Sequence, residues 1–94
     1  MLNLPSIEFL EKTHTFPGKY LFKIIGSAER DFADRVADAV ALVLPNPTDA
    51  MFTQRTSGTG RHLAVTIEVQ VTSAQTVHEL YKQFATLEGI VMLL

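Results

Sequence analysis

The chain has 94 residues, of which 47% are hydrophobic and 19% are charged. This length and composition predict one globular domain and exclude a disordered chain, and the modest core of so small a domain favours oligomerisation. The formal net charge is −2 and the eight basic residues are scattered, which disfavours nucleic-acid binding through a broad cationic surface. The absence of cysteine excludes disulfides, thiolate catalysis and cysteine-ligated zinc, and fits a reducing compartment.

No segment approaches the roughly 20 apolar residues that cross a bilayer, so no membrane span is predicted. The first residues lack the cationic and apolar stretches of a signal peptide, and the cytoplasm is the expected compartment. Residues 1–18 are interpreted as a lead-in that contains one or two helical turns, with Ile7 and Leu10 on one side. Pro17 and Gly18 end it.

Residues 19–25 alternate as a strand, with Leu21, Lys23 and Ile25 on the face opposite the aromatic side chains. Ser27 is expected to cap a helix over residues 28–44. The helix has an apolar stripe, and its opposite side carries charged residues: Arg30, Asp34, Arg35 and Asp38.

Residues 48–56 predict a second strand, with Met51, Thr53 and Arg55 on one face. A turn with Gly58 and Gly60 follows. Residues 61–71 then alternate strictly, with apolar side chains from Leu63 to Val71 on one face and polar ones on the other. The two strands and the glycine turn are typical of a β-hairpin.

Thr72 and Gln75 match a capping box for a helix whose apolar stripe runs from Val77 to Leu87, and Gly89 is expected to cap its C-terminus. Residues 90–94 predict a last short strand. The order β, α, β, β, α, β with right-handed crossovers predicts an α+β ferredoxin-like βαββαβ sandwich, in which two helices cover one face of a four-stranded antiparallel sheet.

The chain resembles the YbeD-like family of small bacterial proteins over residues 16–94. The matching residues are Phe16, Pro17, Tyr20, Lys23, Gly26, Ser57, Gly58, Tyr81, Met92 and Leu94. The resemblance implies the same ferredoxin-like fold, similar to regulatory ACT domains, and implies no activity. The chain departs from the family pattern at the turn, where Arg61 and His62 follow Gly60 in place of an aromatic residue, and at Val91, where many relatives carry a basic residue.

The glycine turn is one candidate site, because successive backbone amides can cup an anion with help from Arg55 and Arg61. The turn lacks the lysine and following helix of a phosphate loop, and a hairpin needs glycine in any case. An ordinary turn is therefore the simpler interpretation.

Titratable residues elsewhere form no recognisable catalytic or metal-binding set. The three histidines lack ligand spacing and are expected to be solvated, and the aspartates of the first long helix suit an exposed charged face. No serine or threonine lies in a nucleophile motif. Neither a cofactor nor a metal site is predicted.

The uncovered sheet face is the other candidate surface. It is expected to carry Lys23, Thr66, Glu68 and Gln70, with Leu21 and Ile25 at its margin and Arg55 or Gln54 from the neighbouring strand. Such a face is either a dimer or ligand surface or an ordinary solvated one. RNA binding by stacking is disfavoured, because Tyr20 and Phe22 are expected on the helix side.

These observations predict a non-enzymatic, ACT-like regulatory or binding module that acts through its open face or edges as a dimer. One alternative is a small enzyme or anion-binding protein whose site comprises Arg55, Arg61 and His62 around the glycine turn. A protein-interaction adaptor is the other.

Overall fold

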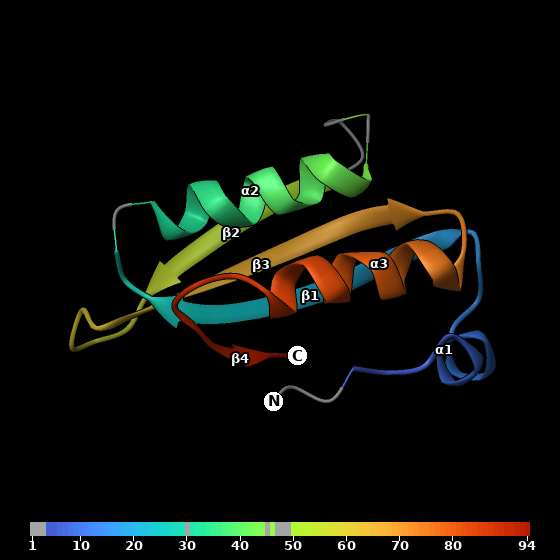
Figure 1. The fold of residues 1–94 in the computed structure, drawn as a ribbon, viewed down its shortest axis with the longest axis horizontal. Helices are drawn as coiled ribbons and strands as arrows, with labels where there is room; N and C mark the ends of the chain where they lie inside the picture. Colours follow the sequence, from blue (N-terminus) through green and yellow to red (C-terminus); the bar gives the residue numbers. More distant parts are fainter. Residues whose placement is uncertain (1–3, 30, 45, 47–49) are drawn as a thin grey trace.

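The computed structural model describes residues 4–29, 31–44, 46 and 50–94, which form three helices and four strands (Figure 1). The elements in chain order are α1 (Ile7–Thr13), β1 (Gly18–Ser27), α2 (Phe32–Val43), β2 (Ala50–Thr56), β3 (His62–Val71), α3 (Ala74–Ala85) and β4 (Ile90–Leu93). The predicted βαββαβ order is confirmed, with α1 added in front.

The strands form one antiparallel sheet in the order β2-β3-β1-β4, and α2 and α3 lie together on one of its faces (Figure 1). This is the ferredoxin-like arrangement. Along β1 and β3 the side chains alternate between buried and more exposed positions, so the register places one set under the helices and the other on the open side.

The core lies between the sheet and the two helices. Phe22 and Ile67 of the sheet, Phe32 of α2 and Phe84 of α3 have no exposed surface. The apolar stripe predicted for α3 is confirmed, since Val77, Leu80, Tyr81 and Phe84 are buried. The stripe predicted for α2 has Phe32, Val36, Val40 and Val43 at its centre and Ala37 beside them. The structure rotates it slightly, because Ala39 is buried while Ala37 is exposed.

The lead-in folds onto the domain through α1. The Ser6 hydroxyl accepts a hydrogen bond from the Phe9 amide at 3.1 Å and caps the helix. Leu10 is fully buried, and Ile7 packs against the core from the same side of α1, as predicted.

The helix boundaries correct three predictions. Ser27 does not cap α2, because β1 extends to it and α2 begins only at Phe32. Ser73 caps α3 in place of Thr72: its hydroxyl accepts from the Thr76 amide at 3.3 Å. Gly89 has a φ of 86° but belongs to the turn before β4, and the C-cap of α3 is Thr86.

The other boundaries differ by smaller amounts. Within the described residues, β2 begins at Ala50, and positions 48 and 49 of the predicted strand lie outside them. Arg30, predicted on the charged side of α2, also lies outside them. β3 begins at His62, one residue later than predicted, and β4 ends at Leu93, one residue earlier.

Candidate functional site

The open face of the sheet is the largest surface that the two long helices leave uncovered. The register sets its residues in rows across the strands. One row joins Met92, Ile25, Ala64 and Arg55, and the next joins Lys23, Thr66 and Thr53. A third row joins Leu21, Glu68 and Met51, and Gln70 pairs with Lys19 on the same side. Every predicted open-face residue except Gln54 therefore lies on this side.

Gln54 lies on the opposite side of the sheet, because it pairs with the buried Val65. Of the two alternatives left open by the sequence, Arg55 is therefore the one that faces the open surface. Phe52 pairs with the buried Ile67 and also faces the helix side.

Large apolar side chains remain exposed on this face. Leu21 on β1 is 61% exposed and Met51 on β2 is 65% exposed. Met92 and Leu94 at the β4 edge are 45% and 58% exposed. Leu94 pairs with Lys23, since the two backbones exchange hydrogen bonds of 3.1 and 2.8 Å. The apolar residues thus surround a lysine.

The charges on the face are mostly positive. Lys19 pairs with Glu68 at 3.4 Å. Among the residues that the structure describes, neither Lys23 nor Arg55 has a carboxylate within ion-pair distance. The face therefore carries two uncompensated cations, although the chain as a whole has a net charge of −2. This local excess favours an anionic partner.

Two shallow depressions lie on this surface. One, of about 260 Å³, is lined by Lys23, Thr53, Gln54, Arg55, Ala64 and Thr66. The small side chains of the central strand form its floor, and the two long cations stand on the strands to either side. The second, of about 420 Å³, is lined by Ile25, Arg55, Thr56, Ser57, Gly58, His62 and Ala64. Arg55 lies in both, so the glycine turn and the open face form one continuous surface.

The turn itself uses part of its polar backbone internally. The Gly60 amide donates to the Ser57 carbonyl at 2.9 Å, and the His62 amide donates to the Ser57 hydroxyl at 3.1 Å. Gly60 has a φ of 75°, which explains the need for glycine there. The predicted cup of successive amides is therefore reduced, and Arg61 is not among the residues that line the adjoining depression.

The aromatic side chains of β1 face the helices. Tyr20 and Phe22 are buried, and the described part of the open face carries no Phe or Tyr. The Tyr20 and Tyr81 hydroxyls lie 2.9 Å apart in the covered layer. Burial, and then the hydrogen bond and proximity to Tyr20, raise the pKa of Tyr81 well above its usual range. These residues bind the layers together and offer no stacking platform.

The histidines lie in three separate places. The His14 ring packs against the Tyr20 ring in a tilted arrangement, with the ring centroids 4.8 Å apart. His62 lines the depression at the turn. His78 is partly buried, with its Nδ1 atom 3.1 Å from the Pro5 carbonyl oxygen, so it contacts the lead-in. The prediction that this histidine is solvated is therefore wrong. Across the described residues, no three metal-binding side chains gather into a cluster.

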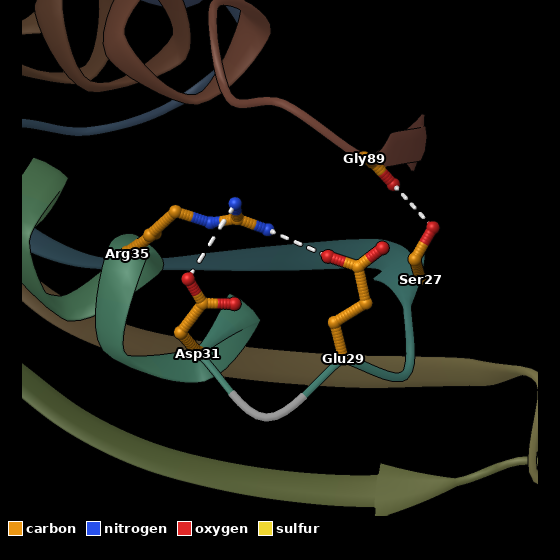
Figure 2. Close-up of polar contacts among 5 residues, drawn as sticks. All are labelled: Ser27, Glu29, Asp31, Arg35 and Gly89. Carbon is orange, nitrogen blue, oxygen red and sulfur yellow. Dashed lines mark hydrogen bonds and ion pairs between the residues drawn. The ribbon is translucent and has the colours of Figure 1, made fainter.

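Arg35 was predicted on the exposed, charged side of its helix, but in the structure its guanidinium group is the centre of a cluster of polar contacts. The side chain is only 26% exposed and lies 3.8 Å from the carboxylates of both Glu29 and Asp31 (Figure 2). It also lies over the Phe32 ring. Its Nε and Nη2 atoms are buried without a hydrogen-bond partner.

Arg35 lies close to the end of β1. There the Gly89 carbonyl accepts from the Ser27 amide at 2.9 Å, with the Ser27 hydroxyl 3.5 Å away (Figure 2). The late start of α2 explains the cluster, since it leaves Glu29 in a loop that folds back onto the arginine. Two carboxylates already neutralise this cation, so the cluster is unsuited to a further anion.

Comparisons with known proteins agree with this structure. The model of a family described as "Protein of unknown function (DUF493)" matches residues 11–94. A "UPF0250 protein" of Shewanella amazonensis is 40% identical over 91 residues, covering 96% of each chain. One of Shewanella halifaxensis is 41% identical over 75 residues, covering 80% of this chain and 83% of its own.

The solution structure of protein HP0495 from H. pylori superposes with a TM-score of 0.70 over 87% of this chain and 86% of its own. Its sequence identity is 14%, so this likeness supports the fold alone. In the described part of the chain, no helix is long and apolar enough to span a membrane. The YbeD-like resemblance is confirmed, and the chain belongs to the DUF493 family, whose Shewanella members carry the name UPF0250.

Proposed function

We propose that the chain is a non-enzymatic binding module of the regulatory, ACT-like kind, which docks a partner protein on its open sheet face. The observation that carries this proposal is the set of exposed apolar side chains around uncompensated cations on a face without a covering helix. Isolated exposed apolar residues are common, whereas a group on one side of a sheet marks an interaction surface.

The chemistry of the face specifies the partner. A second copy placed face to face would bring Lys23 and Arg55 toward the same cations, which opposes self-association through this face. A surface with carboxylates and apolar side chains would complement it. The depressions are shallow, so a broad protein surface suits the face better than an enclosed small molecule.

A second candidate, small-anion binding at the turn end of the face, is favoured by the depression that Arg55 and His62 share. Inorganic phosphate separates it from the first. Saturable stabilisation of the wild type by phosphate in a thermal-shift assay, lost in Arg55→Ala, would support the anion site and argue against a dedicated protein surface.

The docking proposal is tested by capturing partners from a lysate of the parent bacterium with the immobilised protein. Leu21→Asp places a carboxylate among the exposed apolar residues of the face and should abolish capture of a specific partner. Leu42→Asp is the matched control, because Leu42 is 76% exposed on α2, away from the face. Both variants should keep the wild-type unfolding midpoint. Equal capture by both would contradict the proposal.

A further inference from the structure

The two edges of the sheet differ in how open they are to another strand. β4 has four residues, and its pairing with β1 shifts register between Ile25 and Gly26. β2 has seven residues in unbroken register with β3 and, among the residues that the structure describes, a neighbouring strand on one side only. Edge strands are protected from pairing by proline, by charged residues such as lysine and by bulges. β2 contains no proline, lysine or bulge, and its one charged residue, Arg55, lies on the open face of the sheet. Within the described residues, the β2 edge is thus open to another strand.

The hydrogen bonds at the hairpin show which groups face outward. The Ser57 amide donates to the His62 carbonyl at 2.8 Å, so residue 57 directs its backbone groups toward β3. Backbone groups alternate in direction along a strand. Residues 51, 53 and 55 therefore also bond inward, and Ala50, Phe52, Gln54 and Thr56 present N–H and C=O groups at the open edge.

We infer that two copies of the chain pair antiparallel through β2, with the two-fold axis at Thr53, and form one continuous sheet. This register sets Phe52 opposite Gln54 of the second copy and Ala50 opposite Thr56. Every outward-facing residue of one copy then pairs with an outward-facing residue of the other, which gives four pairs. Each pair exchanges two backbone hydrogen bonds, so about eight hydrogen bonds form between the copies. Centring the axis on residue 52 or 54 leaves about six hydrogen bonds between residues that the structure describes, so the register centred on Thr53 is preferred.

The side chains on the helix side fit the same arrangement. Phe52 is 41% exposed although its neighbours across β3 are buried. In the proposed register it lies diagonally across the axis from Phe52 of the second copy, about 7–8 Å away between backbones, which aromatic side chains can span. Pairing would therefore bury two rings that the single copy leaves exposed.

The flank of α2 that faces this edge is made of small residues. Arg35, Ala39 and Leu42 line a depression together with α3, so they mark the side of α2 that faces α3. At 100° per residue, Ala37 and Ala41 lie on the opposite side, and both are exposed. Small side chains there allow α2 and its copy to lie beside each other over the joined sheet.

Charge does not oppose this pairing. Arg55 lies opposite Met51 of the second copy, and Glu68 is the next residue in that row. Arg55 of the second copy lies four residues along the strand from the residue that Arg55 faces, so the two arginines are about 13 Å apart along the strands. Among the described residues of the sheet, the charge nearest to Arg55 across the boundary is therefore the Glu68 carboxylate of the second copy, which has the opposite sign. This interface is separate from the open face, so either proposal can fail alone.

The oligomeric state is tested by sedimentation over a range of concentrations. The wild type should form a reversible dimer. Gln54→Pro removes an outward N–H that β3 does not use, and should give a monomer. Gln54→Ala keeps that N–H and should remain a dimer. A wild type that stays monomeric at about 1 mM would overturn the inference, as would a Gln54→Pro dimer or a dimer broken by Leu21→Asp.

A cross-linking pair tests the register even where the proline variant fails to fold. The natural chain has no cysteine. Thr53→Cys places two thiols opposite each other with backbones about 4.5 Å apart, within reach of a disulfide. Under mild oxidation it should form covalent dimers at least tenfold faster than Gln54→Cys, whose thiols face different residues. Equal rates would refute the axis at Thr53.

Discussion

The two faces of the sheet are built from the same strands and both carry large apolar residues, yet only one face is buried. Ile24 and Phe22 have no exposed surface, whereas Leu21, between Tyr20 and Phe22 in sequence, is 61% exposed. The difference comes from α2 and α3, which cover a single side (Figure 1). Alternation along a strand therefore assigns a residue to a face, while the elements packed against that face decide whether its residues stabilise the fold or remain exposed. The covered face should govern stability, and the open face should govern association.

Neighbouring isoleucines give the strongest test of this comparison. Ile24→Ala should lower the free energy of unfolding by about 2–5 kcal/mol, because it leaves a cavity in a fully buried site. Ile25→Ala removes the same atoms from the half-buried open side and should cost about 1 kcal/mol or less. Urea denaturation of both variants measures the difference. Equal losses would show that the two faces do not differ in this way.

Gly26 tests the covered face through its backbone. A Cβ atom added at this position would overlap the Phe32 ring of α2, so Gly26→Ala should destabilise the protein by about 1–3 kcal/mol. Gly58→Ala is the matched control, since nothing surrounds that position, and should change stability by about 0.5 kcal/mol at most.

Replacing the Phe32 ring by a smaller side chain tests whether its overlap with the new Cβ atom causes the destabilisation by Gly26→Ala. Phe32→Leu combined with Gly26→Ala should cost less than the sum of the two single changes, because the overlap is gone. Strict additivity in a double-mutant cycle would show that the ring is not responsible.

The tyrosine pair gives the smallest of the three effects. Tyr81→Phe leaves the Tyr20 hydroxyl without its partner in the buried layer and should cost about 1 kcal/mol at neutral pH. The wild type should also lose stability as the pH rises above about 10. The unfolded chain then releases the Tyr81 proton, while the folded chain retains it because its pKa is raised.

The two proteins should therefore differ in their alkaline behaviour. Tyr81→Phe should lose less stability than the wild type between about pH 9 and pH 11, because one of the titrating groups is absent. Chemical denaturation at several pH values checks this. Parallel curves would mean that the Tyr81 hydroxyl is not held neutral by the fold.

Much of the candidate site could be predicted from residue pattern. The alternation of β1 and β3 correctly placed Leu21, Lys23 and Glu68 on the uncovered side. The choice between Gln54 and Arg55 stayed open, because residues 51–56 of β2 are all exposed and their pattern has no clear apolar face. Only the register with β3 resolved it.

Helix ends and charge clusters could not be predicted in the same way. Thr72 and Ser73 are adjacent hydroxyl residues, and the docking of Ala74 and Val77 into the core decides which of them caps α3. Arg35 has neighbours typical of a solvated face, but the loop after β1 places Glu29 beside it and the turn before β4 brings Gly89 close to it.

The sequence by itself determined the order of the strands and helices and the apolar side of β1, β3 and α3, because these depend on spacing of 2 and about 3.6 residues within one segment. The tertiary structure alone decided that the glycine turn adjoins the open face, that Arg35 is enclosed, and that β2 is an unprotected edge. Each of these features joins residues far apart in the chain. Strand register and loop path, which no local periodicity encodes, set those contacts.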